Sequence, residues 1–136
     1  MGTEITEGGQ RVLDLMQAQR DGSRSAEELF TDDFVDHDPA EGQPPGGAGL
    51  RWYWAGFERS FSDVRRDLVE VVATPGHLVT VMDLSGTHTG EYQGRAATGR
   101  SFTVRNVQVA RFEDGRMAER WGATDVQGIL EQLGLA

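Results

Sequence analysis

The stretch "RSFTVRNVQVARFEDGRMAERWGATD", residues 100–125, contains two alternating segments joined by a turn. Asp114-Gly115 is a dipeptide typical of the two-residue turn of a β-hairpin. Polar and apolar residues alternate on both sides of this turn, which predicts one long strand before it and a shorter strand, "MAERWGATD", after it. The stretch therefore predicts an antiparallel hairpin around which the rest of the fold can be placed.

The segments around this hairpin predict further strands before it and a helix after it. Residues 67–74 and 77–90 are strand-like and are separated by the turn signal Pro75-Gly76. Residues 126–134, "VQGILEQLG", have helical spacing and end at a glycine.

Before residue 62 the apolar spacing is helical rather than alternating. Helices are predicted over residues 6–22, 25–30 and 49–61, and residues 31–47 between them are rich in Pro, Gly and Asp and predict an irregular segment. In the third helix one stripe is apolar; it consists of Leu50, Trp54, Phe57 and Phe61. The pattern predicts an α+β fold with helices packed on one face of a curved antiparallel sheet.

Composition limits the function classes that this chain can belong to. A length of 136 residues predicts one domain, 1–136. With no Cys, thiolate catalysis and Cys-ligated metals are excluded, and since all 13 basic residues are Arg, Schiff-base lysine chemistry is excluded too. A net charge of −9 argues against nucleic-acid binding. No apolar run suits a signal peptide or a membrane span, so we expect a soluble cytoplasmic protein with no membrane partner.

Asp125 ends the second hairpin strand, and strict alternation places it on the same face as Glu119, Trp121 and Ala123. If that face meets the helices, Asp125 is a buried acid able to transfer protons. The alternative is that Asp125 is the N-cap of the helix that follows, where Asp is favoured. Spacing alone favours the cap slightly and leaves both interpretations open.

Two histidines are candidate pocket residues. His37 in "FVDHDP" could be a metal ligand, a hydrogen-bonding or acid–base group beside a carboxylate, or a loop residue without a role. His88 in "SGTHTG" could line a pocket or lie on a strand surface. The sequence contains no nucleotide-binding or metal-binding motif, so we expect neither a cofactor nor a metal.

Other polar and aromatic residues are candidates for substrate binding. Asn106 and Gln108 alternate with Val104 and Ala110, so a core-facing orientation would require partners or a wet cavity. Trp54 belongs to an aromatic run that either packs in the core or contacts a flat ligand.

Three segments carry a resemblance to a known family. "FVDHDP" (34–39), "GTHTGEYQGRAATGR" (86–100) and "RFEDGRMAERWGATDVQGILEQLG" (111–134) resemble the SnoaL-like polyketide cyclases, within the nuclear-transport-factor-2-like superfamily. The resemblance runs over about residues 10–134. It implies a cone-shaped barrel of a strongly curved antiparallel sheet, with N-terminal helices packed on the concave face.

The resemblance also implies a reaction. Characterised members close the last ring of an anthracycline-type polyketide by a cofactor-free intramolecular aldol condensation, with one pocket Asp as acid/base. The motif W-x-x-x-D makes Asp125 that residue and Trp121 a pocket wall. It also implies that Asp36 or His37 faces the substrate and that His88 lines the pocket.

An aldol closure requires removal of a proton from the carbon α to one carbonyl group. It also requires protonation of the oxygen of the second carbonyl group, whose carbon is attacked. His88, Asn106 and Gln108 are the expected hydrogen-bond donors, and the aromatic helix is expected to stack on a hydrophobic polycyclic ligand. An epoxide hydrolase, an isomerase, a tailoring hydroxylase or a non-catalytic binding module on the same scaffold remains an alternative.

Two expectations concern the outer surface of the sheet. Val107, Val109 and neighbouring Arg residues would form a mixed apolar face suited to a homodimer. Glu119 is expected either to pair with Arg105 or Arg111, or to be a second acid in the site.

Overall fold

The computed structural model describes Gln10, Asp14 and residues 26–136. The predicted helix over residues 6–22 lies outside the described residues, apart from Gln10 and Asp14. The described elements follow each other in this order: α2 (Ala26–Leu29), β1 (Phe30–Asp36), α3 (Gly46–Ser60), β2 (Phe61–Ala73), β3 (His77–His88), β4 (Ser101–Glu113), β5 (Arg116–Thr124) and α4 (Val126–Gln132).

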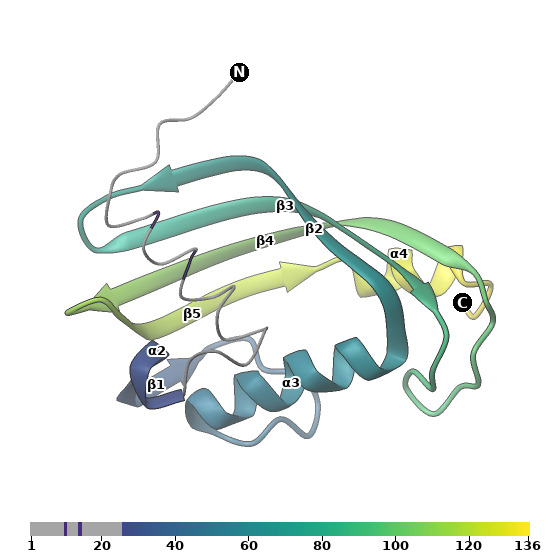
Figure 1. Cartoon of the computed structure of the whole chain (residues 1–136), viewed down its shortest axis with the longest axis horizontal. Helices are drawn as coiled ribbons and strands as arrows, with labels where there is room; N and C mark the ends of the chain where they lie inside the picture. The colour runs from purple at the N-terminus through teal and green to yellow at the C-terminus, as the bar shows by residue number, and fades with distance from the viewer. Residues whose placement is uncertain (1–9, 11–13, 15–25) are drawn as a thin grey trace.

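The five strands form one curved sheet in the order β1-β5-β4-β3-β2, and α3 lies across its concave side (Figure 1). Helix α3 contacts both edge strands, β1 and β2. The α+β class and the curved sheet with helices on one face are therefore confirmed. The sheet stays open rather than closing into a barrel, because α3 occupies the side on which β1 and β2 would have to meet.

Strand β1 is the main departure from the predicted elements. Residues 31–47 were expected to be irregular, but residues 30–36 pair with β5, and they do so in parallel. The sheet is thus mixed rather than wholly antiparallel. The exposed Asp32 and Asp33 hide the strand pattern, which rests on the buried Phe30 and Phe34.

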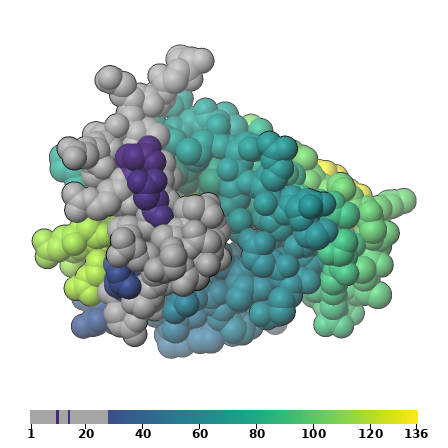
Figure 2. All heavy atoms as spheres, in the orientation of Figure 1, coloured from purple at the N-terminus to yellow at the C-terminus, as the bar shows by residue number. Residues whose placement is uncertain are grey.

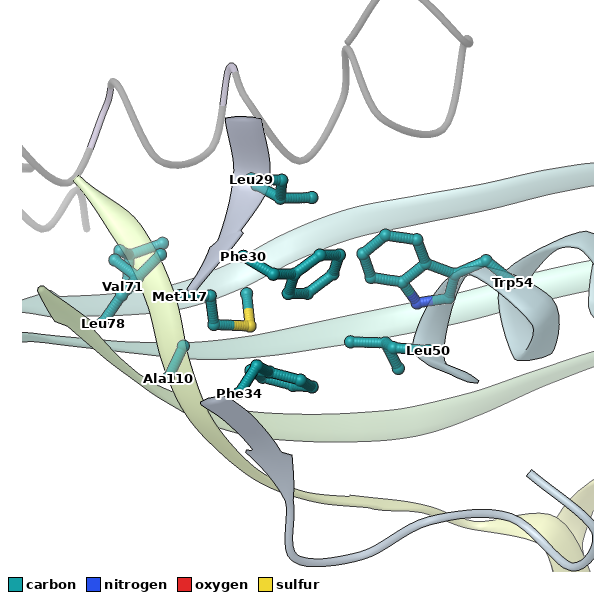
Figure 3. Close-up of a cluster of buried hydrophobic side chains, with 9 residues drawn as sticks. All are labelled: Leu29, Phe30, Phe34, Leu50, Trp54, Val71, Leu78, Ala110 and Met117. Atoms are coloured by element: carbon teal, nitrogen blue, oxygen red, sulfur yellow. The ribbon is translucent and has the colours of Figure 1, made fainter. Parts of the chain in front are cut away.

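The apolar stripe of α3 packs against β1 and the sheet, as its helical spacing predicted. Figure 3 shows Leu50 and Trp54 extending from α3 toward Phe30 and Phe34, with Met117 of β5 beside them. Burial of a side chain such as Leu50 or Phe34 contributes about 1.5–3 kcal/mol. A second cluster closes the other end of the molecule; it contains Phe57, Phe61, Leu84, Phe102, Val104, Ile129 and Leu133. These two clusters fix α3 and α4 on the sheet and leave space between them.

A β-bulge in β5 decides which side chains face this space. Next to the Asp114-Gly115 turn, Phe112 pairs with Met117, but the next pair is Arg111 with Glu119. Ala118 is therefore an extra residue, and both Met117 and Ala118 are buried. One extra residue moves every side chain beyond it in the strand to the opposite face of the sheet.

The bulge corrects the predicted faces of β5. Beyond it, Arg120, Gly122 and Thr124 face the concave side, opposite Ala110, Gln108 and Asn106 of β4. The predicted inner face, with Glu119, Trp121 and Ala123, is the outer face of the sheet. Within the described residues, no helix is long and apolar enough to span a membrane.

Candidate functional site

A cavity of about 1270 Å³ lies between α3, the concave side of β5 and two connecting segments. Ligand pockets of several hundred to about 1,000 Å³ hold drug-sized molecules, so this one has room for a polycyclic ligand. Aromatic and charged side chains share its lining; they include Asp38, Glu41, Trp52, Tyr53, Phe57, Arg59, Glu91, Tyr92 and Arg120.

Arg120 is the buried cation of this pocket, with 8% of the residue exposed. Its Nη1 donates to Asp36 Oδ1 at 2.9 Å, and its Nε donates to Gln108 Oε1 at 2.7 Å. The Asp36 side chain is 4% exposed, so this is a buried ion pair. A buried pair of this kind is tolerated only when further hydrogen bonds satisfy it.

The Asp36 carboxylate receives those further hydrogen bonds from the segment after β1. Asp38 N–H donates to Asp36 Oδ1 at 3.0 Å, and Gln43 Nε2 donates to Asp36 Oδ2 at 2.9 Å. Asp36 therefore does two things: it fixes the Arg120 guanidinium, and it orders the 38–43 segment that forms one wall of the pocket.

Asp38, two residues after Asp36, is a carboxylate that lines the cavity. Strand β1 ends at Asp36, and the last backbone bond toward β5 is from His37 N–H to Arg120 O. The next N–H of β5 that points toward β1 belongs to Gly122. Because β1 has ended, this N–H has no backbone partner there, and it donates to Asp38 Oδ2 at 2.9 Å. The end of β1 thus holds a carboxylate at the pocket.

A chain of amides lies behind Arg120 on β4. Gln108 Nε2 donates to Asn106 Oδ1 at 3.2 Å, and Asn106 Nδ2 donates to Thr124 Oγ1 at 2.6 Å. The structure thus places Asn106 and Gln108 on the concave face. They reach the cavity through Arg120 and Thr124, which line it, rather than by lining it themselves.

Two phenols also line the cavity, and both remain protonated at neutral pH. Burial raises the pKa of Tyr53, partly offset by the nearby Arg120 and Arg66, while Asp36 adds to the rise. Burial, with a smaller contribution from Tyr53, raises the pKa of Tyr92 to about 12. Each phenol can therefore donate a proton or a hydrogen bond to a ligand.

Asp125 is not buried, so the prediction of a buried acid is wrong. It is exposed and is the N-cap of α4, where its Oδ1 accepts from Gly128 N–H at 2.8 Å. The cap, the alternative interpretation of its spacing, is the one that the structure shows. Asp125 is not among the residues that line the cavity.

His37 and Trp121 lie on the outer face, so their predicted places in the pocket are wrong. The His37 ring stacks on Trp121 at a centroid distance of 4.7 Å, and its Nε2 is 2.7 Å from Glu119 Oε2. Glu119 also accepts from Arg111 Nε at 2.7 Å, so it pairs with an Arg as expected. Hydrogen bonds from His37 and then Arg111 lower the pKa of Glu119.

His88 is fully buried and does not line the cavity. Its Nδ1 accepts from Thr98 N–H at 3.1 Å, which ties down the 89–100 connection at one end of the molecule (Figure 2). Its Nε2 has no hydrogen-bond partner among the described residues. This connection supplies Glu91, Tyr92 and Gln93 to the cavity, so His88 contributes by holding that wall.

The aromatic run of α3 divides between core and pocket. Trp54 is buried in the core cluster, so its predicted contact with a ligand is wrong. Trp52 and Tyr53, which precede Trp54 in the run, line the cavity instead.

Sequence reasoning did not identify Arg120, Asp38, Tyr53, Tyr92 and Gly122 as site residues. The missing information is the bulge at Ala118, because a hairpin without it would put Trp121 opposite Gln108. Two apolar residues in succession, Met117 and Ala118, were the available signal in the sequence. No group of three or more acidic or histidine side chains within the described part of the chain is arranged to hold a metal ion.

Comparisons with known proteins agree with this architecture. The model of the SnoaL-like polyketide cyclases matches residues 10–133, whereas no curated protein matches the chain. TsrD from Streptomyces laurentii superposes with a TM-score of 0.81 at 25% identity, over 98% of this chain and 100% of that one.

Two further solved structures have the same fold. IdmH from Streptomyces antibioticus, named as a candidate polyketide cyclase, has a TM-score of 0.78 at 28% identity over 95% of this chain and 99% of its own. AclR from Streptomyces galilaeus, named as a candidate hydroxylase, has a TM-score of 0.79 over 98% and 99%; at 21% identity it supports the fold alone. Since the family model covers nearly the whole chain, this protein belongs to the SnoaL-like polyketide cyclase family.

Proposed function

We propose that this protein is a cofactor-independent cyclase that closes a ring of a polyketide-like substrate by an intramolecular aldol reaction. One observation carries the proposal: a carboxylate, a guanidinium and a phenol, from Asp38, Arg120 and Tyr53, line the same aromatic-walled cavity. These are the groups that an aldol closure needs to remove a proton and to deliver one.

Asp38 is the proposed base. Its Oδ2 accepts from Gly122 N–H and its backbone oxygen accepts from Arg120 Nη1 at 3.5 Å, so the residue has a fixed position at the cavity. The base removes a proton from the carbon α to a substrate carbonyl, and the electron pair of that C–H bond passes to the carbonyl oxygen. The resulting enolate carbon then attacks the second carbonyl of the same molecule.

Tyr53 is the proposed acid. Because burial raises its pKa, it keeps its proton at neutral pH and can donate it to the oxygen of the attacked carbonyl. The phenolate that results is reprotonated by Asp38 directly or through solvent. Substrate and product are then isomers, and neither an oxidant nor a reductant is needed.

The remaining lining would fold the substrate for reaction. Trp52, Phe57 and Tyr92 supply aromatic surface for a flat hydrophobic polycycle. Holding the two reacting carbons close together in one bound conformer can supply a large part of the rate, since it replaces an entropically costly encounter.

The catalytic roles of Asp125, His37 and His88 stay predictions, and their positions argue for other tasks. Asp125 caps α4, His37 stacks on the outer face, and His88 holds the 89–100 connection. We therefore assign the acid–base steps to Asp38 and Tyr53.

The test is product analysis with an aromatic polyketide that carries an uncyclised β-keto ester side chain. Ring closure gives a product of unchanged mass with one new C–C bond, detected by mass spectrometry and NMR. A product that has gained water or one oxygen atom would instead identify a hydrolase or a hydroxylase. No conversion, despite binding, would favour a non-catalytic binding module.

We also propose that the protein is a homodimer through the outer face of the sheet. Val72, Val79, Val109 and Trp121 lie side by side in register across four strands. A second row contains Val81, Val107 and Ala123. Val72 is 48% exposed and Val107 is 37% exposed. An apolar face bordered by charged side chains suits a subunit interface.

A further inference from the structure

The Arg120 guanidinium has one amino group that the protein does not use. Nε is bound to Gln108, and Nη1 is bound to Asp36 and, at 3.5 Å, to Asp38 O. Nη2 donates to none of the described residues, and it is not among the fully buried polar atoms without a partner. A charged donor that lines a cavity with its other bonds fixed is preorganised to bind an oxygen atom.

Gly122 makes room for this amino group. A Cβ at position 122 would lie 2.7 Å from Arg120 Nη2 and 3.1 Å from Arg120 Cζ, so a side chain there would displace the guanidinium from its present position. On the other side, Gln108, the β4 partner of Gly122, comes within 3.3 Å of the same point. The guanidinium therefore lies over the backbone of Gly122 in space that a side chain would fill.

Gly122 also holds a carboxylate, because its N–H donates to Asp38 Oδ2. One residue thus controls two groups: its N–H holds Asp38, and its missing side chain admits Nη2 of Arg120. Both groups line the same cavity. This is the arrangement that enolisation requires, with a base for the proton and a cation for the developing oxyanion.

We infer that Nη2 of Arg120 binds the oxygen of the carbonyl group that is enolised, and that Gly122 is the positioning residue for this contact. The inference rests on the proposed function and specifies its first step. The proton on the carbon α to the carbonyl passes to Asp38, and the electron pair passes to the oxygen bound by Nη2. The ligand class is an aryl ketone or β-dicarbonyl compound whose carbonyl reaches Gly122.

The test measures enolisation separately from ring closure. The probe is 2-acetylnaphthalene, whose methyl protons exchange with D₂O, and NMR follows the rate above the buffer background. Wild-type protein is expected to accelerate the exchange. Gly122→Ala should lower kcat for exchange by about 10², with KM little changed, because it displaces the oxyanion donor while the aromatic walls stay.

Two further variants test whether the effect depends on the position of the Arg120 guanidinium or only on a positive charge. Arg120→Lys keeps a cation beside the buried Asp36 but lacks a second amino group, so it should lose exchange activity as Gly122→Ala does. Arg65→Gln removes an exposed Arg that pairs with Asp67, and it should exchange at the wild-type rate. Thermal unfolding curves confirm that each variant is folded.

A second readout reports on Arg120 itself. The ¹H–¹⁵N signal of its Nε–H, assigned by its loss in Arg120→Lys, should shift in Gly122→Ala and stay in place in Arg65→Gln. An unchanged signal together with wild-type exchange in Gly122→Ala would overturn the positioning role. Wild-type exchange in Arg120→Lys, or no acceleration by the wild-type protein, would overturn the oxygen-binding role.

The experiments distinguish a failure of this inference from a failure of the proposed cyclase function. Exchange that depends on Arg120 and Gly122, without ring closure of any polyketide, would overturn the cyclase proposal alone. Ring closure that continues at the wild-type rate in Gly122→Ala would overturn this inference alone.

Discussion

At the scale of single residues, the pair of Asp36 and Arg120 determines the site. The two residues are 84 positions apart, and their side chains are only 10% (Arg120) and 4% (Asp36) exposed. Removing one partner of a buried pair leaves an uncompensated charge, whereas an exposed pair contributes little. No local sequence pattern identifies such a pair, because each partner lies in an ordinary polar segment.

We therefore expect Asp36→Ala to lower the free energy of unfolding by about 3–5 kcal/mol, because Arg120 would be left buried without its counter-ion. The matched control is Asp67→Ala, which removes the exposed partner of Arg65 and should cost less than about 1 kcal/mol. Urea unfolding followed by Trp fluorescence measures both. Equal losses in the two variants would show that the pair is not buried in solution.

The two tyrosines give a pH prediction at the same scale. Both pKa values are raised on folding, Tyr92 to about 12 from 10.0, so between these pH values the folded chain binds more protons than the unfolded chain. Stability is therefore unaffected by these groups below pH 10.0 and falls as the pH rises toward about 12.

Because the chain has only two Tyr, absorbance at alkaline pH reports on them directly. In Tyr53→Phe the remaining Tyr92 should still ionise well above pH 10.0, because its burial remains, or it should ionise together with unfolding if that comes first. Ionisation near pH 10.0 in the folded variant, as in an unfolded chain, would contradict the burial of Tyr92.

At the scale of elements, the sequence predicted the types of most helices and strands but not the faces of β5. The α3 stripe and the Asp114-Gly115 turn carry local signals, and the structure contains both. The bulge at Ala118 has only a weak local signal, two apolar residues in succession, and it exchanges the two faces, so Trp121 was placed inside and Arg120 outside. Strand β1 was missed because Asp32, Asp33 and Asp36 give it the composition of a loop.

The start of α4 gives a prediction for one element. Asp125→Ala should destabilise the protein by about 1 kcal/mol, because Gly128 N–H loses its acceptor, while Asp125→Asn should stay within a few tenths, since Asn caps well. Thermal unfolding of the three proteins measures this. A large loss in Asp125→Asn would indicate that its charge matters beyond the cap.

At the scale of the whole molecule, the two faces of the sheet carry different side chains. Its concave side holds Arg120 and the amides of β4, whereas its outer side carries rows of Val, Trp121 and the ion pairs of Arg111 and Arg105. The sequence predicted Val107 and Val109 on the outer face from alternation within β4 alone, and the structure places them there. The cavity combines segments far apart in the chain, so its lining could not be derived from spacing.

The outer face yields a prediction on assembly. Val107→Glu places a charge in the centre of the apolar rows and should convert a dimer to a monomer, as measured by light scattering at micromolar concentration. Thr103→Glu is the matched control, because Thr103 is exposed on the same strand and face but outside the rows. A wild-type monomer would contradict the proposed dimer.

We propose that Asp38, held at the end of β1, is the base of a ring-closing reaction in this cavity. The direct measurement is the rate of ring closure by Asp38→Asn and by Asp125→Asn, with the aromatic β-keto ester as substrate. We predict that Asp38→Asn loses a factor of about 10² or more, as expected for a general base, while Asp125→Asn keeps the wild-type rate. Full activity in Asp38→Asn, with activity lost in Asp125→Asn, would show that Asp38 is not the base.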